Sequence, residues 1–163
     1  MGNYLGKPIT KKDSFDKVIQ WSGKNISYCA TGMQGWRVSM EDAHLVKVNL
    51  PKDICIFGVF DGHGGAEVAH FCHKNFIPEL VKNQKFIAEN YRDALIENFL
   101  KMDEILMSPN GKKQIVEIKR SLSKEDKNIQ VDDESMAGCT ANVILFTPKK
   151  IYCANAGDSR SII

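Results

Sequence analysis

A short acidic and glycine-rich segment in the first half of the chain carries residue types that bind metal ions. The sequence Asp-Gly-His-Gly-Gly at 61–65 follows directly after the apolar run 54–60. An aspartate at the end of a buried strand, here Asp61, costs free energy unless it is paired or bound to a cation. The glycines let the backbone turn sharply, so that the carbonyl of Gly62 can face the same cation. Oxygen donors of this kind favour Mg²⁺ or Mn²⁺, and His63 could donate a proton near neutral pH.

A second polar cluster, residues 37–42, contains one arginine and two carboxylates. In an extended chain Arg37, Ser39 and Glu41 lie on one face, and Asp42 lies on the other. A guanidinium group matches two phosphate oxygens, and Glu41 beside it can accept hydrogen bonds from water on a metal ion. Asp42 would then interact with the metal ion only through a water molecule. The cluster therefore indicates a site that holds a phosphoryl group next to a metal.

A third cluster, residues 154–160, again places an aspartate, Asp158, after an apolar strand and a glycine. Each cluster taken alone also has a simpler explanation. Residues 37–42 could form an ion pair on an exposed strand, which is common and contributes little. Residues 61–65 could be a tight turn with solvated side chains, and 157–158 a β-turn with aspartate at a favoured position. The residues by themselves leave catalysis open.

The strands that must position these clusters are predicted from hydrophobic patterning. We expect strands at 25–32, 54–60, 139–146 and 151–156, and a further one starting at 159–163. Residues 37–50 should form a strand, a turn or bend, and a second strand with alternation at 43–48, followed by a turn at 51–53. The strands at 139–146 and 151–156 should form a hairpin around 147–150. The run 54–60 is apolar throughout, which is typical of a strand buried on both faces.

Helices are expected in the middle of the chain, between these strands. One begins near Ala66 and is interrupted by Pro78, a second runs from Asn90 to Met107, and a short third carries Ile115, Ile118 and Leu122. Residues 132–134 are expected in a solvated loop. Strands in hairpin-like runs with helices between them favour an antiparallel α+β fold over a doubly wound one. We divide the chain into an N-terminal arm with a short helical piece, residues 1–25, and a domain from residue 26 to 163.

Composition excludes some classes of protein. The 163 residues include 22 basic and 20 acidic side chains, a net charge of +2, and no basic block, so we do not expect nucleic-acid binding. No apolar stretch is long enough to span a bilayer, and the first 25 residues lack the apolar region of a signal peptide. Five cysteines without a C-x-x-C pair predict a reduced, intracellular protein of the cytoplasm or nucleus, without structural zinc. Myristoylation of Gly2 would be the one route to a membrane, but Gly6 stands where serine or threonine is preferred.

Four segments resemble motifs of the PP2C family of metal-dependent protein serine/threonine phosphatases. They read MQGWR-x-x-MEDAH at 33–44, VFDGHGG at 59–65, GCTA at 138–141 and NAGDSR at 155–160. They occur in the family's order, and the resemblance covers nearly the whole chain from about residue 26. One departure is Cys139, where the family commonly has serine.

The resemblance implies a fold with a central pair of antiparallel sheets flanked by helices, in α-β-β-α layers. It also implies two bound Mg²⁺ or Mn²⁺ ions and a third, more weakly bound ion. Asp61 would bridge the two ions, and the Gly62 carbonyl would bind one of them. Glu41, helped by Asp42, would hold water ligands of the ions, and Asp158 would lie near the third ion.

By the same resemblance, Arg37 would bind the substrate phosphate and His63 would protonate the leaving serine or threonine alkoxide. The implied activity is hydrolysis of phosphoserine and phosphothreonine in phosphorylated protein substrates. The family's domain continues well beyond this length, and its later half supplies further aspartate ligands. We therefore expect residues 1–163 to be the N-terminal portion of such a domain, inactive alone. A non-catalytic module of the same fold that binds phosphoproteins stays open as the alternative.

Overall fold

Antiparallel strands form two separate sheets in this chain. The structure is a computed structural model and describes residues 4–123 and 137–163. The first sheet is a hairpin of β1 (Tyr4–Trp21) and β2 (Lys24–Arg37). The second has five strands: β3 (Asp42–Leu50), β4 (Ile54–His63), β6 (Ala141–Phe146) and β7 (Ile151–Ala156) in that order, with the short β5 (Gly138–Cys139) also paired to β4.

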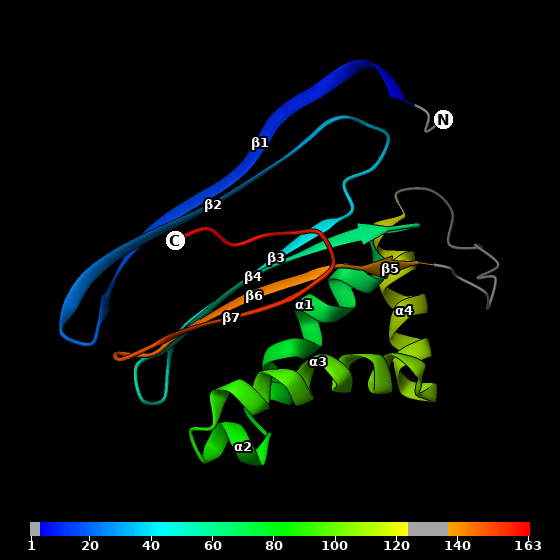
Figure 1. Ribbon diagram of the computed structural model, residues 1–163. Coiled ribbons are helices and arrows are strands. Elements are labelled where there is room, and N and C mark those ends of the chain that lie inside the picture. Colours follow the sequence, from blue (N-terminus) through cyan, green and yellow to red (C-terminus); the bar gives the residue numbers. More distant parts are fainter. Residues whose placement is uncertain (1–3, 124–136) are drawn as a thin grey trace.

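The helices gather on one face of the five-stranded sheet, and the hairpin lies over its other face (Figure 1). They are α1 (Glu67–Leu80), α2 (Gln84–Ile87), α3 (Tyr91–Met107) and α4 (Pro109–Leu122). The predicted antiparallel α+β fold is confirmed. Of the expected α-β-β-α layers, the described residues provide one helical layer and the two sheets.

The main hydrophobic core lies between the five-stranded sheet and the helices. Its fully buried side chains come mainly from β4, α1 and β6: Ile54, Ile56, Phe60, Phe71, Phe76, Leu80, Val143 and Leu145. The rings of Phe60 and Phe76 lie 5.9 Å apart between centroids. Because burial of such side chains contributes roughly 1.5–3 kcal/mol each, this core fixes α1 firmly against the end of β4.

The opposite face of β4 meets the hairpin. Tyr28 of β2 packs edge-on against Phe57, with ring centroids 5.4 Å apart, and Phe15 of β1 packs on His44, at 5.3 Å. The prediction that 54–60 is buried on both faces is correct for most positions but wrong for Val59, which is 47% exposed. The hairpin is only two strands wide, so it does not cover the whole face of the larger sheet.

The predicted short helical piece in residues 8–25 is wrong. These residues belong to β1, to the turn Ser22-Gly23 and to the start of β2, and β1 pairs with β2 from Trp21 opposite Lys24 up to Tyr4 opposite Arg37. Most side chains of β1 are exposed, so backbone pairing rather than alternating burial determines this strand. The division of the chain into an arm, 1–25, and a domain, 26–163, stays a prediction.

The helix predictions are largely confirmed. Helix α1 has Ala66 as its N-cap, α3 covers Tyr91–Met107, and the short third helix is α4. The prediction that Pro78 interrupts the first helix is wrong, because α1 includes Pro78 and continues to Leu80. A proline in the last turn removes one backbone hydrogen bond, and the complete burial of Leu80 offsets that loss.

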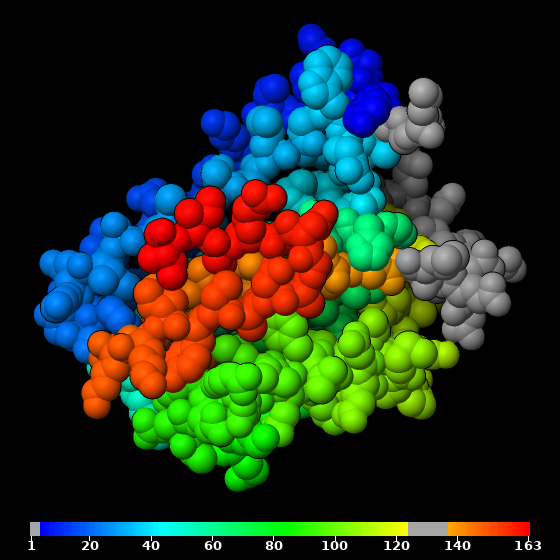
Figure 2. All heavy atoms as spheres, in the orientation of Figure 1, coloured from blue at the N-terminus to red at the C-terminus, as the bar shows by residue number. Residues whose placement is uncertain are grey.

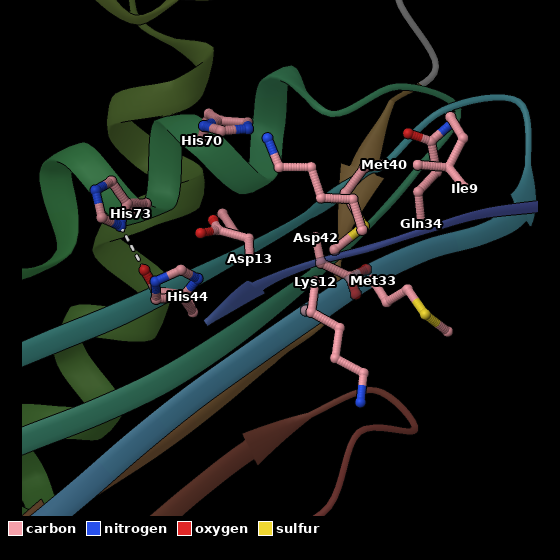
Figure 3. A pocket seen from close by; sticks show the side chains of 13 residues that line it. Ile9, Lys12, Asp13, Met33, Gln34, Met40, Asp42, His44, His70 and His73 are labelled. Atoms are coloured by element: carbon pink, nitrogen blue, oxygen red, sulfur yellow. Dashed lines mark hydrogen bonds between the residues drawn. The ribbon is translucent and has the colours of Figure 1, made fainter. Parts of the chain in front are cut away.

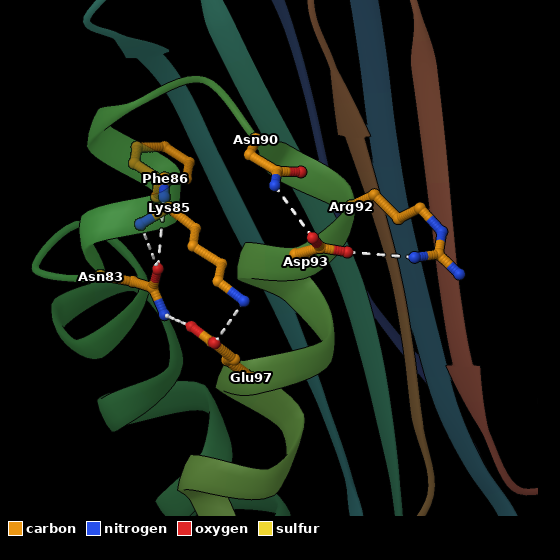
Figure 4. A network of polar contacts seen from close by, with 7 residues as sticks. All are labelled: Asn83, Lys85, Phe86, Asn90, Arg92, Asp93 and Glu97. Atoms are coloured by element: carbon orange, nitrogen blue, oxygen red, sulfur yellow. Dashed lines mark hydrogen bonds and ion pairs between the residues drawn. The ribbon is translucent and has the colours of Figure 1, made fainter.

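A polar network joins α2 to α3 (Figure 4). The Asn83 side chain accepts hydrogen bonds from the backbone N–H groups of Lys85 and Phe86, at 2.8 and 3.3 Å, and so caps α2. Its amide also donates to Glu97 of α3 at 2.9 Å, and Lys85 lies 2.7 Å from the same carboxylate. The exposed ion pair contributes little, so the cap and the packing of Phe86 on Tyr91, with ring centroids 5.4 Å apart, stabilise this connection.

The predicted strand at 159–163 is wrong, since these residues have no regular structure. Their hydroxyl groups bond to side chains near β6 instead: Ser159 with Thr140 at 2.8 Å, and Ser161 donating to Asn142 at 2.5 Å. Figure 2 shows this last segment, in red, lying over the orange strands.

Two sequence predictions, the loop at 132–134 and the modification of Gly2, lie outside the described residues. No helix in residues 4–123 or 137–163 combines the length and the hydropathy of a membrane span.

Candidate metal and phosphate site

The pairing of β3 with β4 places two aspartates side by side. Asp42 lies directly opposite Asp61 in the antiparallel register. Opposite residues of an antiparallel pair share one face of the sheet, and like charges there destabilise the pair. Burial, and next the neighbouring Asp61 carboxylate, raise the pKa of Asp42, while the Arg37 guanidinium acts against the rise. A bound cation would relieve this repulsion between the carboxylates.

Gly62 occupies a position without room for a side chain. Its backbone N–H donates to the Glu41 carbonyl at 3.2 Å. A Cβ atom on Gly62 would lie 2.5 Å from the Glu41 oxygen and 2.9 Å from the Gly65 oxygen. The glycine therefore lets the end of β4 approach the Glu41 backbone closely. The predicted sharp turn at Gly62 is wrong, because Gly62 lies within β4.

Arg37 and Ser39 both contact Glu41, but not as parts of an extended strand. Residues 38–41 form the expected bend, between β2 and β3, so the alternation of faces that an extended chain would give does not apply there. The bend brings an Arg37 nitrogen within 3.8 Å of Glu41, and the Ser39 hydroxyl donates to the same carboxylate at 2.8 Å. The Arg37 side chain is 66% exposed and that of Glu41 only 17%, so the guanidinium remains accessible beside a more enclosed carboxylate.

His63 is held by the strand next to it. It lies opposite Gly138 of β5, and a Cβ atom on Gly138 would be 2.6 Å from Nε2 of His63. The imidazole therefore packs directly on the Gly138 backbone while the residue stays exposed. Glycine at 138 is what permits this contact.

Thr140 connects the end of β4 to the C-terminal segment. Its N–H donates to the Asp61 carbonyl at 2.8 Å, and its hydroxyl accepts from the Asp61 N–H at 3.3 Å. The same hydroxyl lies 2.8 Å from that of Ser159. Asp158 is exposed and precedes Ser159 in the sequence, so the hydrogen bond of Ser159 to Thr140 places it near this region. The structure thus brings the segments at 61, 140 and 158 to one edge of the sheet.

The sequence analysis missed Glu67. This residue is 4% exposed in the first turn of α1, its carboxylate packs against Gly65, and Lys119 of α4 lies 3.8 Å away. The sequence did contain one signal for Glu67. It is an acidic residue in the first turn of the expected helix, where the helix dipole favours a negative charge. Thr140 and Gly138 lay within a recognised motif, but no role followed from the residues alone.

A cavity of about 640 Å³ adjoins this site (Figure 3). The hairpin contributes Lys12 and Asp13 to its lining, and α1 contributes His70 and His73. Nδ1 of His73 lies 2.8 Å from the His44 carbonyl, and burial, then His73, lower the pKa of His70.

Asp42 also lines the cavity, whereas Arg37, Asp61 and His63 do not. The cavity therefore opens beside the site and does not enclose it.

The donor set suits a hard cation. Within residues 4–123 and 137–163 no group of three or more His, Cys, Asp or Glu side chains is arranged to hold a metal ion. The aspartate pair and the backbone around Gly62 offer oxygen donors only, which fits Mg²⁺ or Mn²⁺ better than zinc.

The close approach at Gly62 gives a stability prediction. Gly62→Ala should lower the free energy of unfolding by about 1–3 kcal/mol, since the added methyl group overlaps a backbone oxygen. Gly6→Ala is the matched control, because a Cβ there meets nothing within 4 Å, and we expect a change within about 0.5 kcal/mol. Urea unfolding of both variants measures this difference, and equal effects would contradict the geometry.

Comparison with known proteins places the chain in a family. Residues 26–163 match the family model described as protein phosphatase 2C. The whole chain is 51% identical to probable protein phosphatase 2C 4 and 47% identical to protein phosphatase 2C 1, both of Paramecium tetraurelia, and covers 50% of each. It is 37% identical to protein phosphatase 2C homolog 2 of Schizosaccharomyces pombe, of which it covers 40%. The chain spans about half the length of the Paramecium relatives, and it belongs to the protein phosphatase 2C family.

Proposed function

We propose that this chain supplies the Asp61 and Arg37 side of the active site in a metal-dependent protein serine/threonine phosphatase. The observation that carries the proposal is the register of β3 and β4, which sets Asp42 opposite Asp61 beside Gly62. Membership of the family supports it independently. The substrates would be proteins that carry phosphoserine or phosphothreonine.

The acidic residues would hold two Mg²⁺ or Mn²⁺ ions. Asp61 is the proposed bridging ligand, and the Gly62 carbonyl the proposed second donor. Glu41 and Asp42 would orient water ligands of the ions. Divalent ions, when bound, supply an activated water molecule near neutral pH and neutralise phosphoryl oxygens. The side-by-side carboxylates support this assignment, because a cation removes the cost of their proximity.

Arg37 would bind the phosphoryl group of the substrate. Its planar guanidinium can donate two parallel hydrogen bonds to two phosphate oxygens. The assignment is supported by its exposure, at 66% of the side chain, and by the Glu41 contact at 3.8 Å, which limits the directions the guanidinium can take. Arg37 would thereby orient the phosphorus for in-line attack.

His63 would donate the proton that the leaving group requires. A serine or threonine alkoxide is a poor leaving group, and an imidazolium can protonate it near neutral pH. The packing of the ring on Gly138 supports this role, since it restricts the orientation of the imidazole while leaving it accessible.

Asp158 is the proposed ligand of a third, more weakly bound ion. The hydrogen bonds from Ser159 to Thr140 and from Thr140 to the Asp61 backbone support a position near the other ions. Its exposure is in line with weaker binding.

A phosphoprotein-binding module of the same fold, without turnover, is the alternative function. It would bind a phosphopeptide through Arg37 and release no phosphate in Mn²⁺. The predicted intracellular location also remains part of the proposal, resting on five cysteines that form no disulfide.

Metal dependence is the first prediction for the full-length protein. Hydrolysis of a phosphothreonine peptide should require Mg²⁺ or Mn²⁺ and stop in excess chelator. Asp61→Asn should lower turnover by more than about 100-fold, because it removes an anionic ligand at the metal ions. Asp16→Asn, on an exposed part of β1, is the matched control and should retain activity. Full activity in chelator would contradict the proposal.

The role of His63 can be separated from that of the metals by the leaving group. His63→Gln should lower turnover of a phosphoserine peptide by roughly 10²–10⁴-fold, the contribution of a general acid. Nitrophenyl phosphate has a good leaving group that needs no proton, so its hydrolysis should fall far less. His73→Gln, an exposed histidine on α1, controls for the loss of an imidazole. Equal losses on both substrates would rule out proton donation by His63.

A further inference from the structure

Two cysteines that are distant in sequence touch behind the candidate site. Cys72 lies in α1 and Cys139 in β5, and their sulfur atoms are 3.7 Å apart. None of the five cysteines forms a disulfide, and Cys29 and Cys153 are exposed. Cys72 is 7% exposed and Cys139 is half-buried, so a small oxidant can reach the pair from the Cys139 side.

We propose that Cys72 and Cys139 are an oxidative modification site, at which hydrogen peroxide forms a disulfide that reversibly lowers the activity of the adjacent site. The consequence for activity rests on the proposed function, whereas the disulfide itself does not.

The reaction balances with peroxide as the oxidant. The Cys139 sulfur attacks one peroxide oxygen, the O–O bond breaks, and water leaves, giving a sulfenic acid at Cys139. The Cys72 sulfur then attacks the Cys139 sulfur, the S–O bond breaks, and a second water leaves. Two thiols have given up two electrons and two protons, and one peroxide has become two waters. A thiol reductant reverses the bond by exchange.

The geometry requires a modest movement. A disulfide has an S–S distance of about 2.05 Å, so the sulfur atoms must approach by on the order of 1.6 Å. Rotation of the two side chains can provide part of this distance. The remainder must come from α1 and β5, which lie beside each other (Figure 1).

The movement would be transmitted to the site because both cysteines are tied to it. Cys139 is the register partner of Gly62, and the adjacent Gly138 packs on His63 with no room for even a methyl group. On the other side, α1 follows His63, the last residue of β4, after only the three residues 64–66. Drawing β5 toward α1 therefore disturbs the proposed ligand Gly62 and the proposed acid His63 together.

The test treats the folded full-length protein with hydrogen peroxide, blocks the remaining thiols with iodoacetamide, and analyses a digest by mass spectrometry. We expect a Cys72–Cys139 cross-linked peptide, two hydrogen atoms lighter than the separate peptides, that disappears with dithiothreitol. Cys139→Ser should abolish it, and Cys153→Ser, an exposed control on β7, should not. Absence of this cross-link, or its formation only after denaturation, would overturn the proposal.

The phosphatase activity of the same samples tests whether the disulfide lowers turnover. Peroxide should lower wild-type turnover by about tenfold or more, the effect of disturbing the surroundings of metal ligands, and dithiothreitol should restore it. Cys139→Ser, compared with its own untreated sample, should resist this loss. A complete cross-link with unchanged turnover would overturn the regulatory role. If the reduced protein has no phosphatase activity at all, the proposed function fails, and the cross-link alone then decides on the modification site.

Discussion

The repulsion between Asp42 and Asp61 is the constraint on which the proposed site depends. The two carboxylates are neighbours because β3 and β4 pair in one register, and a shift by one residue would turn one of the side chains to the other face. Burial and the second carboxylate raise the pKa of Asp42. Two like charges in this position cost stability, and the cation that we propose for this site would relieve that cost.

Packing and hydrogen bonds at the end of β4 maintain this register and hold the backbone of the site in place. Phe60, fully buried next to Asp61, anchors the end of β4 in the core with Phe76 of α1. The Gly62 N–H bonds to the Glu41 carbonyl, and Thr140 bonds to both backbone groups of Asp61. The end of β4 is thus held from two sides. Because these backbone contacts are close, the proposed bond between Cys72 and Cys139 would disturb the end of β4.

Sequence reasoning found the clusters but not their mutual positions. The apolar run 54–60 and the spacing of Tyr91, Leu95 and Met102 predicted β4 and α3, because burial leaves a pattern in the sequence. The turn at 51–53 was predicted, but the register that joins Asp42 to Asp61 also depends on an irregularity between Lys47 and Leu50, which does not follow from patterning.

Other misses have similar causes. The strand β1 was missed because its side chains are mostly exposed, so pairing with β2 leaves little alternation to detect. The segment 159–163 has the composition of a strand, but serine hydroxyls bond to Thr140 and Asn142 instead of entering the ladder. Glu67 was missed because its ion pair with Lys119, more than fifty residues away in sequence, depends on the packing of α4 against α1.

The central claim, that the aspartate pair exists to bind a divalent cation, is tested most directly by thermal unfolding of full-length wild type and Asp61→Asn, each in chelator and in millimolar Mn²⁺. Without metal, the variant should have the higher Tm, since it lacks one of two like charges. With Mn²⁺ the order should reverse, because a cation that binds only the native state stabilises the wild type by mass action, with a rise in Tm of at least about 2 °C. A variant that melts below the wild type in chelator, together with a wild-type Tm that Mn²⁺ leaves unchanged, would contradict the account.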